Sequence, residues 1–146
     1  MNRERGFTLV ELIIATAITG LIVGVLGTAV FQIVNVTDYG GDKLVAAHEL
    51  QNAAHWVSRD AQMADNATGG SELVLTLPDA STITYTVNST ELLRTAGGSS
   101  MTLAQNITSA NFSVENRIVT MSITSSPDGR WNVSENRTYK VHLRPT

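Results

Sequence analysis

The pattern of hydrophobic and polar residues divides the chain into three parts, and the first is apolar. Residues 7–36 are apolar or small almost throughout, and Glu11 is the only charged residue among them. A helix of that length would span about 45 Å, more than the roughly 30 Å hydrocarbon core of a membrane. A buried helix so uniform would need a larger protein around it. We therefore predict a transmembrane helix over residues 7–36.

The second part, residues 37–68, has the periodicity of an amphipathic helix. Gly40 and Gly41 indicate a break, and Asp42 is the expected N-cap of a helix that ends near Asn66. Apolar residues recur at spacings of three and four, so they would pack on a sheet while charged residues face outward. The apolar stripe contains Leu44, Ala47, Leu50, Ala54, Val57, Ala61 and Ala64, and the outward set contains Lys43, Glu49, Arg59 and Asp60.

The third part, residues 69–146, alternates short apolar and polar runs between turn residues, which is typical of an antiparallel sheet with one wet face. The predicted fold class is α+β, with a long N-terminal helix, half in the membrane and half amphipathic, packed on an antiparallel β-domain. Residues 101–107 fit either a strand or a helical turn. The other predicted strands are 72–77, 82–88, 91–95, 111–116, 117–124 and 137–144.

Composition excludes several classes of protein. The formal net charge is −3, which argues against a nucleic-acid-binding surface, because such surfaces are basic. The chain has no cysteine, so zinc ribbons, thiol catalysis and disulfide frameworks are excluded.

The first six residues read as a short basic leader. Arg3 and Arg5 outweigh Glu4, and arginines beside a first apolar segment tend to stay cytoplasmic. The polar bulk of the chain would then lie outside the membrane. A secretory signal peptide would be cut after its apolar stretch, but the sites there are poor. The other reading is a cut after Gly6, which would leave Phe7 with a free amine.

The stretch RGFTLVELIIATAI, residues 5–18, resembles the N-terminal motif of type IV prepilins and type II secretion pseudopilins. That motif is a basic leader ending in Gly, then Phe, then Thr-Leu-hydrophobic-Glu and a long apolar helix. The resemblance implies a pilin-like fold, cleavage by prepilin peptidase between Gly6 and Phe7, N-methylation of Phe7, and Glu11 as the family's acidic residue. It also implies membrane lipid, other pilin or pseudopilin subunits and an inner-membrane assembly platform as partners.

A looser resemblance covers later stretches. VSRDAQMA, ELLRTAGG and LAQNITSANFSV resemble elements of minor pilins and pseudopilins of the J and W kind. This resemblance favours a minor over a major subunit.

Glu11 needs a partner, because an ionised side chain in the bilayer core costs on the order of 2.5–3.5 kcal/mol. A protonated or interfacial glutamate is one alternative. The favoured partner is the Phe7 amine of a neighbouring subunit, although the amine of the same chain is one helical turn away. Gly20 and Gly24 form G-x-x-x-G, a candidate helix-packing site, and local melting there would let the helix stretch.

We expect no enzyme, metal or cofactor. His48 and His55 are seven residues apart and do not form the H-E-x-x-H zinc motif, and His142 stands alone. Asp79, Asp128 and Glu135 could offer oxygens to calcium, but their settings are typical of ordinary turns.

Seven N-x-[ST] sequons are more than the roughly two that chance would give for this composition. Glycosylation is one interpretation, and a β-domain rich in Asx turns is the other. The sequons begin at Asn35, Asn66, Asn88, Asn106, Asn111, Asn132 and Asn136, and the candidate glycosylation sites are Asn66, Asn88, Asn106, Asn132 and Asn136.

The sequence thus predicts a structural subunit, minor rather than major, of a type IV pilus (a fimbrium) or of a type II secretion pseudopilus serving protein secretion. It would sit in the cell membrane as a single-pass protein with its N-terminus in the cytoplasm, and later in a surface or periplasmic filament. The alternative is a membrane-anchored extracytoplasmic binding module that does not polymerise.

Overall fold

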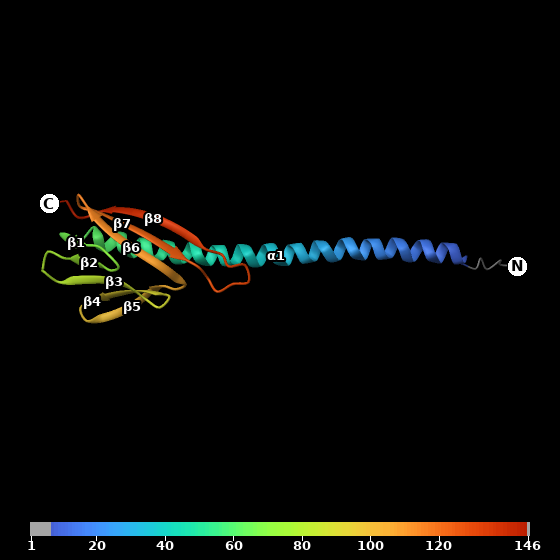
Figure 1. The fold of residues 1–146 in the computed structure, drawn as a ribbon, viewed down its shortest axis with the longest axis horizontal. Coiled ribbons are helices and arrows are strands. Elements are labelled where there is room, and N and C mark those ends of the chain that lie inside the picture. The colour runs from blue at the N-terminus through green and yellow to red at the C-terminus, as the bar shows by residue number, and fades with distance from the viewer. Residues whose placement is uncertain (1–6, 146) are drawn as a thin grey trace. The chain divides into compact units, whose positions relative to one another are not determined.

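The computed structural model describes residues 7–145 (Figure 1). The predicted leader, including Gly6 of the predicted cleavage site, lies outside the described residues. The chain divides into two compact units, Met1–Asp38 and Tyr39–Thr146, and each is described by itself. Helix α1 (Leu9–Ala61) begins in the first unit, and the described strands all belong to the second.

The first unit contains the apolar part of α1. Its apolar side chains are exposed all around the helix from Leu9 to Val36. The helix continues through Gly20 and Gly24 without interruption, so local melting is not observed there.

Helix α1 has different limits from those that the sequence predicted. Gly40 and Gly41 lie inside α1, as does Asp42, which is therefore not an N-cap. Glycine permits a break without requiring one, since each costs only about 1 kcal/mol relative to alanine in a helix. The helix ends at Ala61 rather than near Asn66.

The second unit contains two antiparallel sheets instead of the single antiparallel sheet that the sequence predicted. Asn106, which has a left-handed φ of 58°, lies in the turn that joins them. The five-stranded sheet has the order β1 (Asn66–Thr68), β2 (Leu73–Thr76), β3 (Thr82–Asn88), β4 (Glu91–Ala96), β5 (Ser99–Ala104). The three-stranded sheet has the order β6 (Ile107–Glu115), β7 (Ile118–Ser125), β8 (Glu135–His142). The α+β class is confirmed, and β1 was not predicted.

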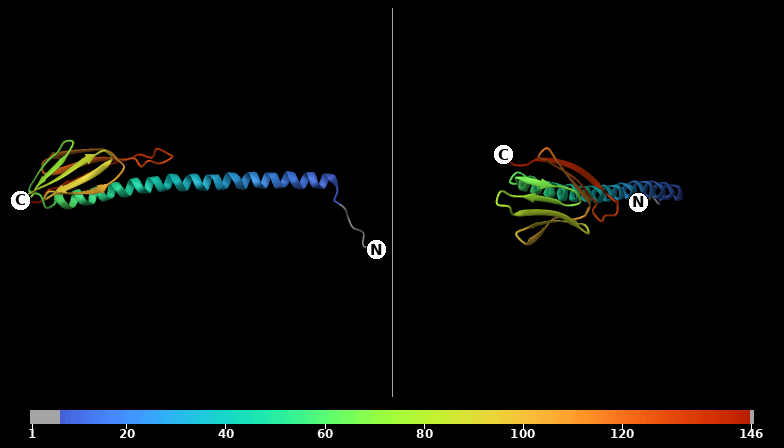
Figure 2. Two further views of the ribbon diagram at one scale, coloured as in Figure 1. Left: turned by 90° about the horizontal axis from the view of Figure 1, so that it is seen from below. Right: turned by 60° about the vertical axis from the view of Figure 1, so that its left-hand side comes forward.

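The two sheets meet where β1 approaches β6. The backbone N–H of Phe112 donates to the carbonyl of Gly70 at 3.0 Å. A Cβ on Gly69 would lie 2.6 Å from the Phe112 carbonyl oxygen, so only glycine fits this approach without movement. Both sheets cover one face of the C-terminal part of α1 (Figure 2).

The core lies between α1 and the sheets. Leu50, Val57 and Ala61 of the predicted stripe are buried, but Leu44 is 73% exposed. The buried stripe is rotated from the predicted one and also includes Ala46, Ala53 and Asp60. Because small alanines occur on several faces of the helix, the sequence alone did not show which face is buried. From the sheets, the core receives Leu73, Leu75, Ile83, Tyr85, Leu92, Leu103, Ile107, Phe112, Val119, Met121 and Ile123.

The connection between β7 and β8 returns alongside α1. Gly129 lies against the Asp42 carboxylate, which would clash with a Cβ at this position. Next to it, Lys43 Nζ lies 3.3 Å from Glu135 Oε1. These contacts hold the connection and the start of β8 to the helix.

Candidate functional site at the start of the apolar helix

Glu11 lies in the first turn of α1, and the N-terminus of this helix is capped. Its backbone N–H donates to Thr8 Oγ1 at 3.3 Å. Thr8-x-x-Glu11 therefore has the spacing of a capping box, in which a threonine hydroxyl satisfies a free N–H of the first turn. A carboxylate there also interacts favourably with the helix dipole, by about 0.3–1 kcal/mol. Our sequence reasoning missed this role, although the T-x-x-E spacing before an apolar run signals it.

The carboxylate of Glu11 has no ion-pair or hydrogen-bond partner among the described residues. Exposed Val10 and Leu12 flank it, and Phe7 is 81% exposed. The dipole contribution is smaller than the ~2.5–3.5 kcal/mol cost of an ionised acid in a bilayer core. The local helix start therefore does not offset the cost of an ionised Glu11 in a membrane core, so an ionised Glu11 there would need a partner beyond the described residues.

The surface around Glu11 is apolar enough for lipid. Helix α1 is the described helix whose length and composition would allow it to cross a membrane, and its most apolar stretch has no buried residue. This fits a single-pass membrane anchor typical of pilins. Its threonine hydroxyls donate to carbonyls one turn earlier, which lowers the cost of placing them in lipid. The pairs are Thr16 with Ile13, Thr19 with Ala15, Thr28 with Val25 and Thr37 with Ile33.

Gly20 and Gly24 leave an open surface on this helix. A Cβ at either position would meet nothing within 4 Å in the described structure. Neither glycine is therefore required by a contact within the chain. Their packing against a second helix stays a prediction.

Asp60 was predicted to face outward, and this is wrong, because Asp60 is 1% exposed. Tyr85 Oη donates to its Oδ2 at 2.5 Å, and Arg94 Nε donates to the same oxygen at 2.6 Å. Burial and the hydrogen bond to Asp60 raise the pKa of Tyr85, and the hydrogen bond to Asp60 raises the pKa of Arg94. The network joins the last turn of α1 to β3 and β4.

Trp56 extends this network on the helix surface. The guanidinium of Arg94 lies 5.4 Å from the centre of the Trp56 ring, and that of Arg59 lies 5.3 Å from it. Both distances suit cation–π contacts. The network is structural, because it fixes the end of α1 to the sheet.

The residues considered for a metal lie apart. Within residues 7–145, no three His, Asp or Glu side chains gather in a group that could hold a metal ion. His48, His55 and His142 are exposed. Asp79 holds a turn by accepting bonds from the N–H and hydroxyl of Ser81, and these bonds lower its pKa. Glu135 pairs with Lys43, as described above, and Asp128 lies in the β7–β8 connection.

Of the seven sequon asparagines, Asn35 lies inside α1 and Asn111 inside β6, and the other five lie in turns or near strand ends. Asn106 and Asn132 have positive φ, which asparagine adopts more readily than most residues. Asn66 Oδ1 accepts from the N–H of Ala67, and Asn136 Nδ2 donates to Thr124. These roles favour local turn chemistry at some of the sequons. Of the five candidates, Asn66, Asn88, Asn132 and Asn136 are exposed and Asn106 is half-buried, and glycosylation of the set stays a prediction.

Comparison with known proteins identifies the N-terminal segment. Residues 1–27 match the family described as the prokaryotic N-terminal methylation motif. No curated protein and no solved structure matches the chain. The match covers the predicted cleavage position, Glu11, Gly20 and Gly24. The chain therefore carries the signature of type IV prepilins and pseudopilins, joined to an α+β layout consistent with a pilin-like fold.

Proposed function

We propose that the chain is a non-enzymatic structural subunit, minor rather than major, of a type IV pilus or a type II secretion pseudopilus. Prepilin peptidase removes residues 1–6, and the new N-terminal Phe7 is methylated. The methylation motif at residues 1–27 supports this proposal. The observation that carries it is the position of Glu11 on an exposed apolar helix, where no described residue pairs with its carboxylate.

Cleavage would create a positively charged group that could pair with Glu11. The freed α-amine of Phe7 is positive and lies next to the positive end of the helix dipole, where a cation is disfavoured. A carboxylate from a neighbouring subunit would neutralise it. At 4 Å such a pair is worth roughly 4 kcal/mol at an effective dielectric near 20. The pair would set the axial register of each subunit as it enters the filament.

The exposed apolar surface supports the same proposal. Lipid would cover this surface before assembly, and the helices of other subunits would cover it afterwards. At Gly20 and Gly24 the backbone lies open, so a neighbouring helix could approach closely. The assembly platform of the inner membrane would deliver the subunit from the first environment to the second.

Assignment to the minor subunits rests on the second unit. The stretches VSRDAQMA and ELLRTAGG, which resemble minor pilins and pseudopilins of the J and W kind, contain Asp60 and Arg94. These two residues form the 2.6 Å ion pair between α1 and β4. This contact supports reading the two stretches as one structural unit.

The decisive experiment is the mass of the mature protein isolated from membranes of its own cells. We expect a chain that begins at Phe7 and carries one added methyl group. An intact Met1 would instead favour the non-polymerising membrane-anchored binding module. The ratio of this chain to the main subunit in purified filaments then separates a minor from a major subunit, and the machine to which those filaments belong separates pilus from pseudopilus.

A further inference from the structure

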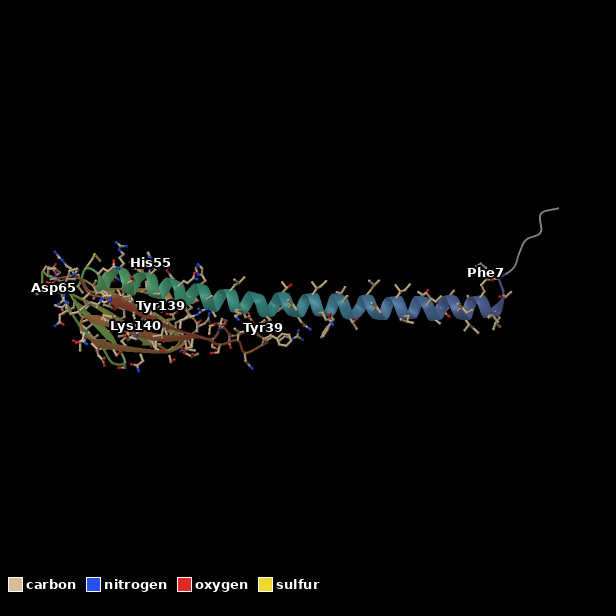
Figure 3. All side chains as sticks on the ribbon, turned by 90° about the horizontal axis from the view of Figure 1, so that it is seen from above. Phe7, Tyr39, His55, Asp65, Tyr139 and Lys140 are labelled. Carbon is tan, nitrogen blue, oxygen red and sulfur yellow. The ribbon has the colours of Figure 1, made fainter. Side chains whose placement is uncertain are left out.

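A groove runs between α1 and β8 in the second unit. It encloses about 560 Å³ between residues 51–59 of α1, Gln62 just after the helix, and residues 139–141 of β8. A second hollow shares Ser58 and Gln62 with the first and extends it to Pro145. In Figure 3, His55 lies on the helix side, and Tyr139 and Lys140 lie on the strand side.

Strand β8 presents an unpaired backbone edge along this groove. In the described structure β8 pairs with β7 and is the outer strand of its sheet. The N–H of Leu143 donates to the Arg117 carbonyl, next to the Ile118–His142 pair of the register. Because the bonds of an antiparallel pair alternate, Lys140 and His142 direct their N–H and C=O groups away from β7. Another strand could use these groups.

The groove is positively charged, although the whole chain has a net charge of −3. Its described lining includes Arg59, Lys140 and Arg144 and no acidic side chain. Lys140 also borders a separate small hollow with Glu115, and no ion pair joins the two. The nearby backbone and the apolar side of the groove, which includes Val141, would suit a peptide better than a phosphate polymer.

We propose that this groove binds an extended, carboxylate-rich peptide segment of another protein, which adds to β8 as a further strand. Successive side chains of an added strand point to opposite faces. One set would meet His55 and Arg59 of α1, and the other would meet Lys140 and His142. Main-chain bonds would give affinity, and the positive charges of Arg59 and Lys140 would select acidic side chains. A second copy of the chain would bring the same basic lining to the groove rather than complementary acidic side chains.

This interaction goes beyond the proposed function and does not require polymerisation. It is tested on the full chain, ¹⁵N-labelled in detergent micelles, with a synthetic decapeptide of alternating Glu and Val. We expect saturable NMR shifts confined to β8 and to residues 51–62, the last turns of α1 and the residue after it. Amide hydrogen exchange of Lys140 and His142 should slow at least tenfold in the complex.

Matched peptides and variants separate the two parts of the proposal. Replacing every Glu of the peptide by Gln should weaken binding at least tenfold. N-methylation of the peptide bonds that would face β8 should do the same without changing its charge. Lys140→Glu should weaken binding at least tenfold, while Arg130→Glu, an equal charge change in the β7–β8 connection, should not.

Several results would overturn the proposal. These are no saturable binding, equal binding of the Glu and Gln peptides, or undiminished binding of the N-methylated peptide. Binding of inorganic polyphosphate but not of the Glu peptide would show a simple anion site instead. Processing at Phe7 should be unchanged by Lys140→Glu, so failure of the groove proposal and failure of the filament proposal are distinguishable.

Discussion

Glu11 and Asp60 are both acidic residues among apolar neighbours on α1, but their surroundings differ. Glu11 lies in the first unit, on the part of α1 whose apolar side chains are all exposed. Asp60 lies in the second unit and is buried, with Tyr85 and Arg94 as donors to one oxygen. The chain supplies the partners of Asp60, whereas none of its described residues supplies a partner for the Glu11 carboxylate.

This difference shows how an acid in an apolar setting can be interpreted. A buried acid with donors from the sheet of its own unit ties parts of the fold together, because removing the acid would leave those donors buried without a partner. An acid on an exposed apolar helix, without such donors among the described residues, favours a partner beyond those residues. Acidic residues on one helix thus have different interpretations, which are a structural role for Asp60 and the proposed assembly role for Glu11.

The largest expected effect is that of Glu11→Ala on assembly. Incorporation into filaments should fall at least tenfold, because an ion pair worth roughly 4 kcal/mol would be lost. Membrane insertion should remain, since the helix becomes more apolar. The measurement is immunoblotting of sheared or purified filaments against the membrane fraction.

Thr8→Ala is the matched control for Glu11. It removes the hydroxyl that caps the Glu11 N–H, at a cost of about 1 kcal/mol to the helix, but keeps the carboxylate. Incorporation should stay near that of the wild type. If both variants lost assembly equally, the capped helix start would explain Glu11, and the intersubunit pair would not be needed.

The next largest effect is that of Asp60→Asn on stability. This change removes the charge that Arg94 needs, and the free energy of unfolding should fall by about 3 kcal/mol. Arg94 is 19% exposed and can regain some water, so the low end of the range for buried pairs applies. Urea unfolding in micelles, followed by near-ultraviolet circular dichroism, measures the loss. Asp65→Asn, at an exposed acid nearby, should change stability by less than about 0.5 kcal/mol.

Glycines should also behave differently on the surface of α1 and at the contact between the two sheets. Gly69→Ala should destabilise the fold by about 1–3 kcal/mol, because the new Cβ would press on the backbone of Phe112. Gly40→Ala meets nothing within 4 Å on α1 and should stabilise the helix by up to about 1 kcal/mol. Thermal unfolding of the two variants side by side tests this contrast. An equal effect of the two changes would mean that the sheets do not meet closely at Gly69.

The smallest effect concerns Tyr85 and pH. The pKa of Tyr85 is raised in the folded state by burial and by its bond to Asp60. The stability that it contributes is therefore complete below about pH 10, where the unfolded tyrosine is neutral, and is lost as pH rises above that value. Tyr85→Phe should cost about 1–2 kcal/mol at neutral pH and should make the alkaline fall shallower. Urea unfolding between pH 8 and 11 measures both, and an unchanged alkaline slope would contradict the role of Tyr85.

The sequence by itself determined the long apolar helix, the processing motif and the α+β class. These features are local, because each rests on the composition or spacing of residues that are close in the chain. Thirty neighbouring positions with one charge predict an apolar helix without any knowledge of its surroundings.

Only the tertiary structure decided which face of α1 is buried, how the strands divide into two sheets and what surrounds Asp60. The partners of Asp60 come 25 and 34 positions later, from strands whose alignment no local pattern fixes. Alanines on several sides of the helix made its buried face ambiguous. An aspartate is predicted to be exposed unless the donors that surround it in the fold are known. The α1–β8 groove could not be predicted from the sequence either, because the seven other described strands separate its two walls along the chain.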